Sequence, residues 1–182
     1  MTTIKKLVEN LESVELTDSD ILDITRNKTN LMVYEDLEKY NDINDVLGEH
    51  GACIILFQTK SATEGHWTLI FRSSPKTLTF FDPYGIPVDS EIKLSPFQLR
   101  IHEGKEVPHL SHLINQSEYK LLQNTTRYQQ IFKNIADCGR HCCVRLLFRK
   151  YSPTRYKKFI LNSFEGMNPD ETVSMLTVLF SV

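Results

Sequence analysis

A cysteine followed by glycine stands at the start of an apolar segment, in the sequence Asp137-Cys138-Gly139. The residues that follow, 142–148, are apolar enough to form a buried helix. A helix N-terminus presents unpaired N–H groups and the positive end of the helix dipole, which favour the nucleophilic thiolate form of a cysteine. We expect Asp137 to cap this helix and Gly139 to let a substrate backbone pass close to it. Cys138 is therefore the candidate nucleophile, and a core helix that happens to contain cysteines is the alternative.

A candidate base and an orienting carboxylate lie upstream, in two segments that both read as strands. Residues 65–72 and 78–82 are rich in β-branched and aromatic residues and are separated and followed by turn residues. His66 opens the first strand and Asp82 closes the second, so an antiparallel pairing would bring them to the same end of the sheet. A thiolate nucleophile needs such a base, and the base needs a carboxylate to fix its tautomer. The pattern predicts a Cys-His-Asp triad, against the alternative of an exposed histidine and an ordinary turn aspartate.

Three blocks of the chain resemble the signature blocks of the superfamily of cysteine peptidases that contains the adenovirus maturation protease and the SUMO proteases. They are GHW at 65–67, FDPYG at 81–85 and DCGRH at 137–141, and the order His, Asp, Cys agrees with that family. More narrowly, the last two blocks and the short chain resemble the proteases of virophages, polinton transposons and giant DNA viruses, which act in capsid maturation. The resemblance extends from residue 34 to residue 171, and it likens Trp67 to the tryptophan that shields the family's histidine.

The same family places a glutamine before the cysteine, and its side-chain amide donates to the oxyanion of the tetrahedral intermediate. The spacing usual in better-known members falls on Ile131 or Phe132, whereas the available residues are Gln129 and Gln130. The resemblance implies Gln129 as the donor, with Gln130 as the alternative and the backbone N–H of Cys138 as a second donor. Two glutamines that face solvent in a polar loop remain the competing interpretation.

The fold expected is α+β in a single domain over residues 1–182. The resemblance implies a papain-like cysteine protease fold, in which a central mixed β-sheet packs against the catalytic helix, with flanking helices. The continuous apolar run at 52–57 fits a central strand that is buried on both faces. The expected regions are a mostly helical N-terminal segment (1–48), a sheet region (52–130), a catalytic helix (137–150) and C-terminal helices (153–180).

Capping residues predict two further helices. Thr17 begins one that runs through about Thr25, and Asn168 begins a last one that runs through Leu179. The segment 88–123 shows the weakest pattern. Its three histidines lie on loop-like, proline-interrupted sequence and are poor alternative bases, because no strand or carboxylate signal adjoins them; they are His102, His109 and His112.

Composition excludes several classes of function. The chain has 182 residues, of which 41% are hydrophobic and 24% charged, and its net charge is −2, so no global charge draws it to nucleic acid or a membrane surface. We interpret the one basic run as a solvated face; it comprises Arg149, Lys150, Arg155, Lys157 and Lys158. Adenovirus proteases use DNA and a peptide as activators, and we expect this chain to need neither. A monomer is expected.

The four cysteines, Cys53, Cys138, Cys142 and Cys143, show no disulfide spacing, which predicts a reducing compartment. No signal peptide and no apolar run of membrane length is seen. We expect the host cytoplasm, where a virus assembles, and packaging into the virion. Cys138, His141 and Cys142 could be read as metal ligands, but structural zinc takes four, so we expect no metal and no cofactor.

The expected function is that of a cysteine endopeptidase that cleaves viral capsid or other structural proteins during virion maturation. The resemblance implies small residues, glycine above all, just before the scissile bond. Two alternatives stay open at this point. One is a hydrolase of ubiquitin-like modifiers, and the other is a non-catalytic structural domain that kept the fold.

Overall fold

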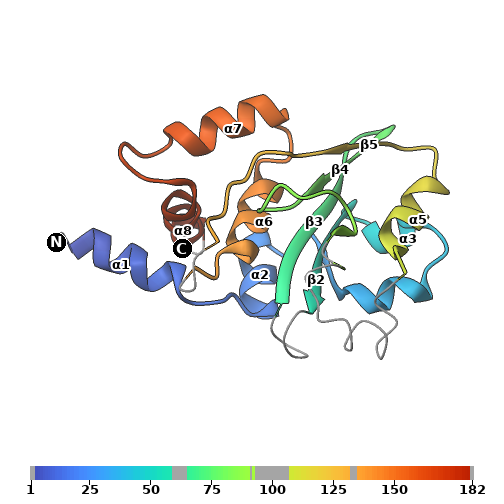
Figure 1. The fold of residues 1–182 in the computed structure, drawn as a ribbon, viewed down its shortest axis with the longest axis horizontal. Coiled ribbons are helices and arrows are strands. Elements are labelled where there is room, and N and C mark those ends of the chain that lie inside the picture. Colours follow the sequence, from blue (N-terminus) through green and yellow to red (C-terminus); the bar gives the residue numbers. More distant parts are fainter. Residues whose placement is uncertain (1–2, 59–64, 91, 93–106, 132–134, 181–182) are drawn as a thin grey trace.

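A computed structural model describes residues 3–58, 65–90, 92, 107–131 and 135–180. A five-stranded sheet forms the middle layer, and helices cover both of its faces (Figure 1). The sheet contains both parallel and antiparallel strand pairs, and most of the helices come before the first strand or after the last one. This arrangement agrees with the α+β class expected from the sequence.

The strands lie in the sheet in the order in which they occur along the chain. They are β1 (Asn30–Val33), β2 (Ala52–Gln58), β3 (Gly65–Ser74), β4 (Thr77–Phe81) and β5 (Lys120–Gln123). The three central strands pair antiparallel, whereas both edge strands pair parallel to their neighbours. The sequence predicted the hairpin β3–β4 correctly but placed the start of the sheet at residue 52. The prediction missed β1, because four residues on an edge are too short to show a period.

Strand β2 separates two hydrophobic cores. Its residues from Ala52 to Phe57 are all buried, which confirms the prediction of a strand covered on both faces. Because side chains alternate along a strand, Ile54 and Leu56 join one core while Ile55 and Phe57 join the other.

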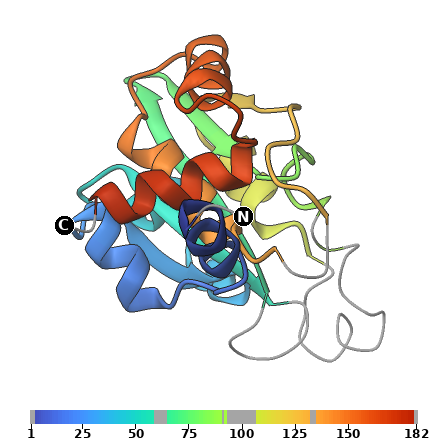
Figure 2. The ribbon, with the colours of Figure 1, turned by 90° about the vertical axis from the view of Figure 1, so that its left-hand side faces the viewer.

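Five helices lie on the first face, with α6 packed directly on β3. They are α6 (Cys138–Leu147), α2 (Asp18–Thr25), α8 (Pro169–Phe180), α1 (Thr3–Glu12) and α7 (Pro153–Asn162). Helix α8 packs on the outer side of α6, and α1 packs on α8 (Figure 2). Helix α6 is therefore sandwiched between the sheet and a second layer of helices, and all but one of its residues are buried.

The second face carries three short elements, η1 (Tyr34–Lys39), α3 (Ile43–Leu47) and α5 (His109–Asn115). Helix α5 corrects the prediction that His109 and His112 lie on loop-like sequence. Leu110, Leu113 and Ile114 give it an apolar face that packs in the second core. Pro108 is its N-cap rather than an interruption. His102 lies outside the described residues.

The predicted helix starts at Thr17 and Asn168 are confirmed. Thr17 and Asp20 form a reciprocal capping box at the start of α2. The Asn168 side chain accepts hydrogen bonds from the backbone N–H groups of Asp170 and Glu171, which begins α8. The residues of the basic run are all exposed, as expected for a solvated face. In the part of the chain that the structure describes, no helix has the length and apolar character to cross a membrane.

Gly65→Ala should destabilise the fold, because a Cβ at this position would overlap the backbone carbonyl of Phe57 on the paired strand β2. We expect the free energy of unfolding, measured by urea denaturation, to fall by about 3 kcal/mol or more, the upper end of the cost of overpacking, because the clash is with backbone atoms. Gly166→Ala is the control. Its Cβ would meet no atom within 4 Å, and its φ of +76° should cost only about 1 kcal/mol. Equal losses in the two variants would contradict the close approach of β2 and β3.

Candidate active site

His66 and Asp82 form a buried pair at one end of the β3–β4 hairpin. The antiparallel register pairs Leu69 with Phe81, so the start of β3 and the residue after β4 lie at the same end. His66 donates from Nε2 to Oδ2 of Asp82 across 2.8 Å. The histidine is 4% exposed and the aspartate is fully buried. His66 and Asp82 therefore lie next to each other at one end of the sheet, as the sequence predicted.

Asp82 is fixed by hydrogen bonds to both its backbone and its carboxylate. Oδ1 accepts the backbone N–H of Tyr84 at 2.6 Å, which leaves Oδ2 to His66. The backbone of Asp82 is held by Asn124, whose side chain accepts the Asp82 N–H and donates to the Asp82 carbonyl. A fully bonded carboxylate of this kind holds an imidazole in one orientation and one tautomer.

Cys138 is the first residue of α6, as the sequence predicted, and is 8% exposed. The cap, however, is not the one expected. Asp137 precedes the helix but makes no capping hydrogen bond; its carboxylate accepts the Ser174 hydroxyl at 3.0 Å and pairs with Arg140 Nε at 3.1 Å. Only Oδ2 therefore has a hydrogen-bond donor among the described residues, while Oδ1 lies at ion-pair distance from Arg140 without a hydrogen bond. Burial raises the pKa of Asp137 to about 8, against the opposing charge of Arg140.

The electrostatics of His66 connect it to both Asp82 and Cys138. Burial alone would lower the pKa of the ring below its ordinary value of 6.5. The hydrogen bond to Asp82 and the interaction with Cys138 outweigh burial, so the pKa of His66 is raised. Nδ1 makes no hydrogen bond within standard limits to any described residue, while Nε2 is occupied by Asp82. His66 is thus hydrogen-bonded to Asp82 and interacts electrostatically with Cys138, while its Nδ1 has no hydrogen-bond partner among the described residues.

The aromatic ring stacked on His66 belongs to Tyr84, a residue to which the sequence analysis gave no role. The two ring centroids lie 4.5 Å apart with an interplanar angle of 14°. Trp67 instead packs in the core cluster that includes Cys138, and its carbonyl accepts the Cys142 thiol.

Gly139 packs against the protein on the side where a Cβ would stand. A Cβ there would lie 3.4 Å from Trp67 Cδ1 and 3.5 Å from Leu16 Cβ, which are ordinary van der Waals contacts. The close approach of a substrate backbone to Gly139 stays a prediction.

Gln129 is 1% exposed, so the interpretation of a solvent-facing glutamine is wrong for this residue. Its backbone N–H, like that of Tyr128, donates to the carbonyl of Pro83, the residue after Asp82. Its side-chain Oε1 is buried and unpartnered among the described residues. Gln130 is half-buried, and its backbone N–H donates to Asp170. Ile131 is 65% exposed, and Phe132 lies outside the described residues.

The other cysteines are structural. Cys53, Cys142 and Cys143 are fully buried and free, and burial raises the pKa of each thiol. Their raised pKa values keep these thiols protonated and unreactive. Within the described ranges, no group of three or more His, Cys, Asp or Glu side chains is placed to hold a metal ion.

Sequence reasoning missed three supporting residues besides Tyr84. Asn124 lies 42 residues from Asp82 and carries no motif. His141 and Asp170, which form a second buried pair at 2.9 Å, lie on separate helices. The sequence does indicate that His141 is unusual, because it is a polar residue at a buried position of an apolar helix. Its partner Asp170 could not be predicted from the sequence.

The chain belongs to the same family as the uncharacterized protein V9 of Sputnik virophage. The two are 36% identical over 169 residues, which cover 92% of this chain and 96% of the relative. This relationship supports a virophage origin. No protein-family model matches the chain. A solved structure, the central domain of the uncharacterized Lpg1148 protein from Legionella pneumophila, aligns over 92% of this chain and 96% of its own length, with 16% identity and a TM-score of 0.41.

Asp82→Asn should lower the pKa of the His66 ring by about one pH unit or more, equivalent to ~1.4 kcal/mol, because it removes the strongest interaction that raises this pKa. NMR titration of the histidine ring would measure the change. Since the pKa in the folded protein lies above 6.5, the stabilising charge is fully present below pH 6.5 and is lost as the pH rises through the raised value. The stability difference between wild type and variant should shrink accordingly at alkaline pH. A ring that titrates near 6.5 in both proteins would contradict the pairing.

Proposed function

We propose that this protein is a cysteine endopeptidase of the superfamily that contains the adenovirus and SUMO proteases, with a papain-like fold. The observation that carries the proposal is the buried His66–Asp82 pair that interacts with Cys138 at the first turn of α6. Burying an ion pair costs desolvation free energy, which favours a functional reason for keeping it. Histidines with shifted pKa values are also concentrated at functional sites.

In the proposed reaction, Nδ1 of His66 takes the proton of the Cys138 thiol, or already holds it in a thiolate–imidazolium ion pair as the raised pKa of the ring favours, and the thiolate attacks the carbonyl carbon of the scissile peptide bond. Asp82 stabilises the imidazolium that forms, because its Oδ2 already accepts the Nε2–H. The imidazolium then protonates the leaving amine as the C–N bond breaks, which leaves a thioester on Cys138. Water, deprotonated by His66, hydrolyses the thioester and restores the thiol.

The oxyanion of each tetrahedral intermediate needs hydrogen-bond donors. The backbone N–H of Cys138 lies in the first turn of α6, where N–H groups have no partner within the helix. The side-chain amide of Gln129 is the second donor in this proposal. Its burial, and the attachment of its backbone to the residue after Asp82, support this role over that of the more exposed Gln130.

The substrates proposed are capsid or other structural proteins of the virion, cut after small residues such as glycine. The relationship to a virophage protein supports a viral role. A groove of about 870 Å³ is lined in part by Trp67, which follows His66 in the sequence, and we propose it as a surface for an extended peptide; His66 and Cys138 do not themselves line it. Its apolar lining comprises Leu16, Leu31, Met32, Val33 and Leu56. The enzyme is proposed to act as a monomer in the host cytoplasm or the virion, without a nucleic-acid activator, metal or cofactor.

Cys138→Ala should abolish cleavage of a co-expressed virophage capsid protein, because it removes the nucleophile. The matched control is Cys53→Ala, which removes a buried thiol on the opposite face of the sheet and should leave cleavage intact. Cleavage that survives Cys138→Ala would overturn the proposal. Labelling of Cys138 by a SUMO or ubiquitin vinyl sulfone, with the capsid protein left uncut, would instead support a hydrolase of ubiquitin-like modifiers.

Gln129→Ala should lower kcat for a peptide ending in Gly-Gly-aminomethylcoumarin by about 100- to 1,000-fold, the usual cost of losing one oxyanion donor. Gln130→Ala is the control and should change kcat by less than about threefold, because the hydrogen bond that Gln130 makes among the described residues comes from its backbone, which the substitution keeps. The reverse result would make Gln130 the donor. Unchanged kcat in both variants would remove glutamine from the mechanism.

A further inference from the structure

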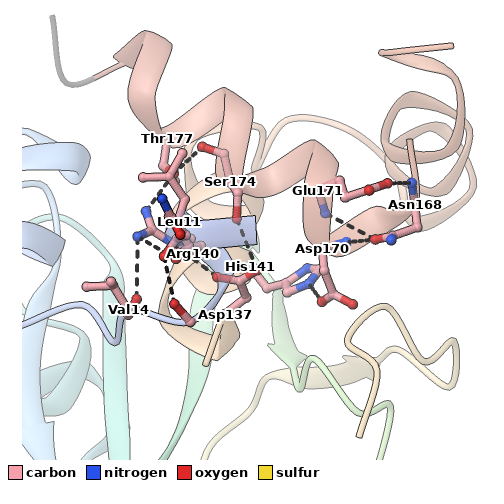
Figure 3. Close-up of polar contacts among 12 residues, drawn as sticks. Leu11, Val14, Asp137, Arg140, His141, Asn168, Asp170, Glu171, Ser174 and Thr177 are labelled. Atoms are coloured by element: carbon pink, nitrogen blue, oxygen red, sulfur yellow. Dashed lines mark hydrogen bonds and ion pairs between the residues drawn. The ribbon is translucent and has the colours of Figure 1, made fainter. Parts of the chain in front are cut away.

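A second buried histidine–aspartate pair lies behind the candidate active site. His141, one turn after Cys138 on α6, donates from Nε2 to Oδ1 of Asp170 at the start of α8 across 2.9 Å (Figure 3). Both side chains are fully buried. Neither residue takes part in the proposed reaction, so the cost of burying the pair needs another explanation.

The second oxygen of Asp170 binds the segment that carries Gln129. Oδ2 accepts the backbone N–H of Gln130 at 3.0 Å. One carboxylate therefore connects three parts of the chain: α6 through His141, α8 through its own backbone, and the segment 128–130.

The same segment has an anchor on its other side. The backbone N–H groups of Tyr128 and Gln129 both donate to the carbonyl of Pro83, at 2.9 and 3.0 Å. The segment around Gln129 is thus held at two points. One is Pro83, the residue after Asp82, and the other is Asp170, whose side chain is bonded to His141 on α6. The first anchor fixes the segment to the histidine side of the site, and the second fixes it to the cysteine side.

An aspartate suits the second anchor because two donors converge on it from different directions. A carboxylate offers two acceptor oxygens, whereas the isosteric amide of asparagine offers only one and presents N–H groups at the other position. Asp170 is itself fixed, because its backbone N–H donates to the Asn168 side chain at 2.8 Å.

We propose that Asp170 and His141 are positioning residues that hold Gln129 in register with Cys138, so that its amide meets the oxyanion. This inference rests on the proposed peptidase function. Oxyanion donors stabilise the transition state only when they are placed in advance, and a displacement of about 1 Å can cost about 100-fold in rate. The pair therefore acts on the transition state through Gln129 and does not itself touch the substrate.

The test compares two reactions of the same cysteine. Hydrolysis of the Gly-Gly-aminomethylcoumarin peptide needs the oxyanion donors, whereas alkylation of Cys138 by iodoacetamide needs only the thiol and His66. Asp170→Asn should lower kcat about 10-fold or more, up to the ~100- to 1,000-fold effect of losing the donor itself, with little change in KM. The alkylation rate should stay within about twofold of wild type. His141→Phe, which keeps a ring but removes the donor to Asp170, should act in the same direction and serves if Asp170→Asn does not fold.

A double-mutant cycle separates positioning from general damage. In a Gln129→Ala background, Asp170→Asn should cost about twofold or less in kcat, because the residue it positions is already gone. Thr177→Val is the matched control. It removes the hydroxyl that accepts from Arg140 across the same α6–α8 interface, and should lower the melting temperature while leaving kcat within about twofold.

If wild-type hydrolysis depends on Cys138, three results would overturn this inference and leave the proposed function standing. The first is a wild-type kcat in Asp170→Asn, and the second is an equal loss of hydrolysis and alkylation rates. The third is a kcat in the double variant that equals the product of the two single effects of Asp170→Asn and Gln129→Ala. A wild-type protein whose hydrolysis is no faster than that of Cys138→Ala would overturn the proposed function and this inference with it.

Discussion

The buried hydrogen bond between His66 and Asp82 constrains everything around it. A carboxylate removed from water is stable only if its oxygens are bonded, and Asp82 satisfies both with the Tyr84 N–H and the His66 ring. This requires an antiparallel register that brings the start of β3 and the end of β4 to the same end of the sheet. It also requires the turn after β4 to fold back, and Asn124 to reach across from beyond β5. The hairpin, the turn and the edge strand are thus positioned by one polar interaction.

The helix that carries Cys138 is constrained from its other side by a polar layer. Asp137, Arg140 and His141 are bonded to side chains of α8, and Arg140 also donates to the backbone carbonyls of Leu11 in α1 and Val14 just after it. These bonds hold α6, and with it Cys138, between the sheet and the outer layer of helices. Preorganisation of this kind is what covalent catalysis by a thiol requires.

Local signals made much of the site predictable. His66, Asp82 and Cys138 each adjoin a strand end or a helix start that is legible in sequence, and pairing rules bring such ends together. Aspartate at 137 was assigned a capping role from its neighbours along the chain, and that assignment is wrong. Its actual partner, Ser174, comes from a distant helix. Strand β1 was missed because its four residues are too few to show a period, and α5 because the proline before it was interpreted as an interruption although its apolar residues have helical spacing. The Asp170–His141 pair could not be predicted because its two residues are distant in sequence.

The central claim is that Cys138 attacks a peptide carbonyl with His66 as its base. Acid quenching of the reaction with a Gly-Gly peptide ester, followed by mass spectrometry of the intact protein and peptide mapping, tests it directly. The account predicts an acyl group in thioester linkage on Cys138, present in wild type and absent in His66→Ala. Turnover without any covalent adduct, or an adduct on another residue, would contradict it.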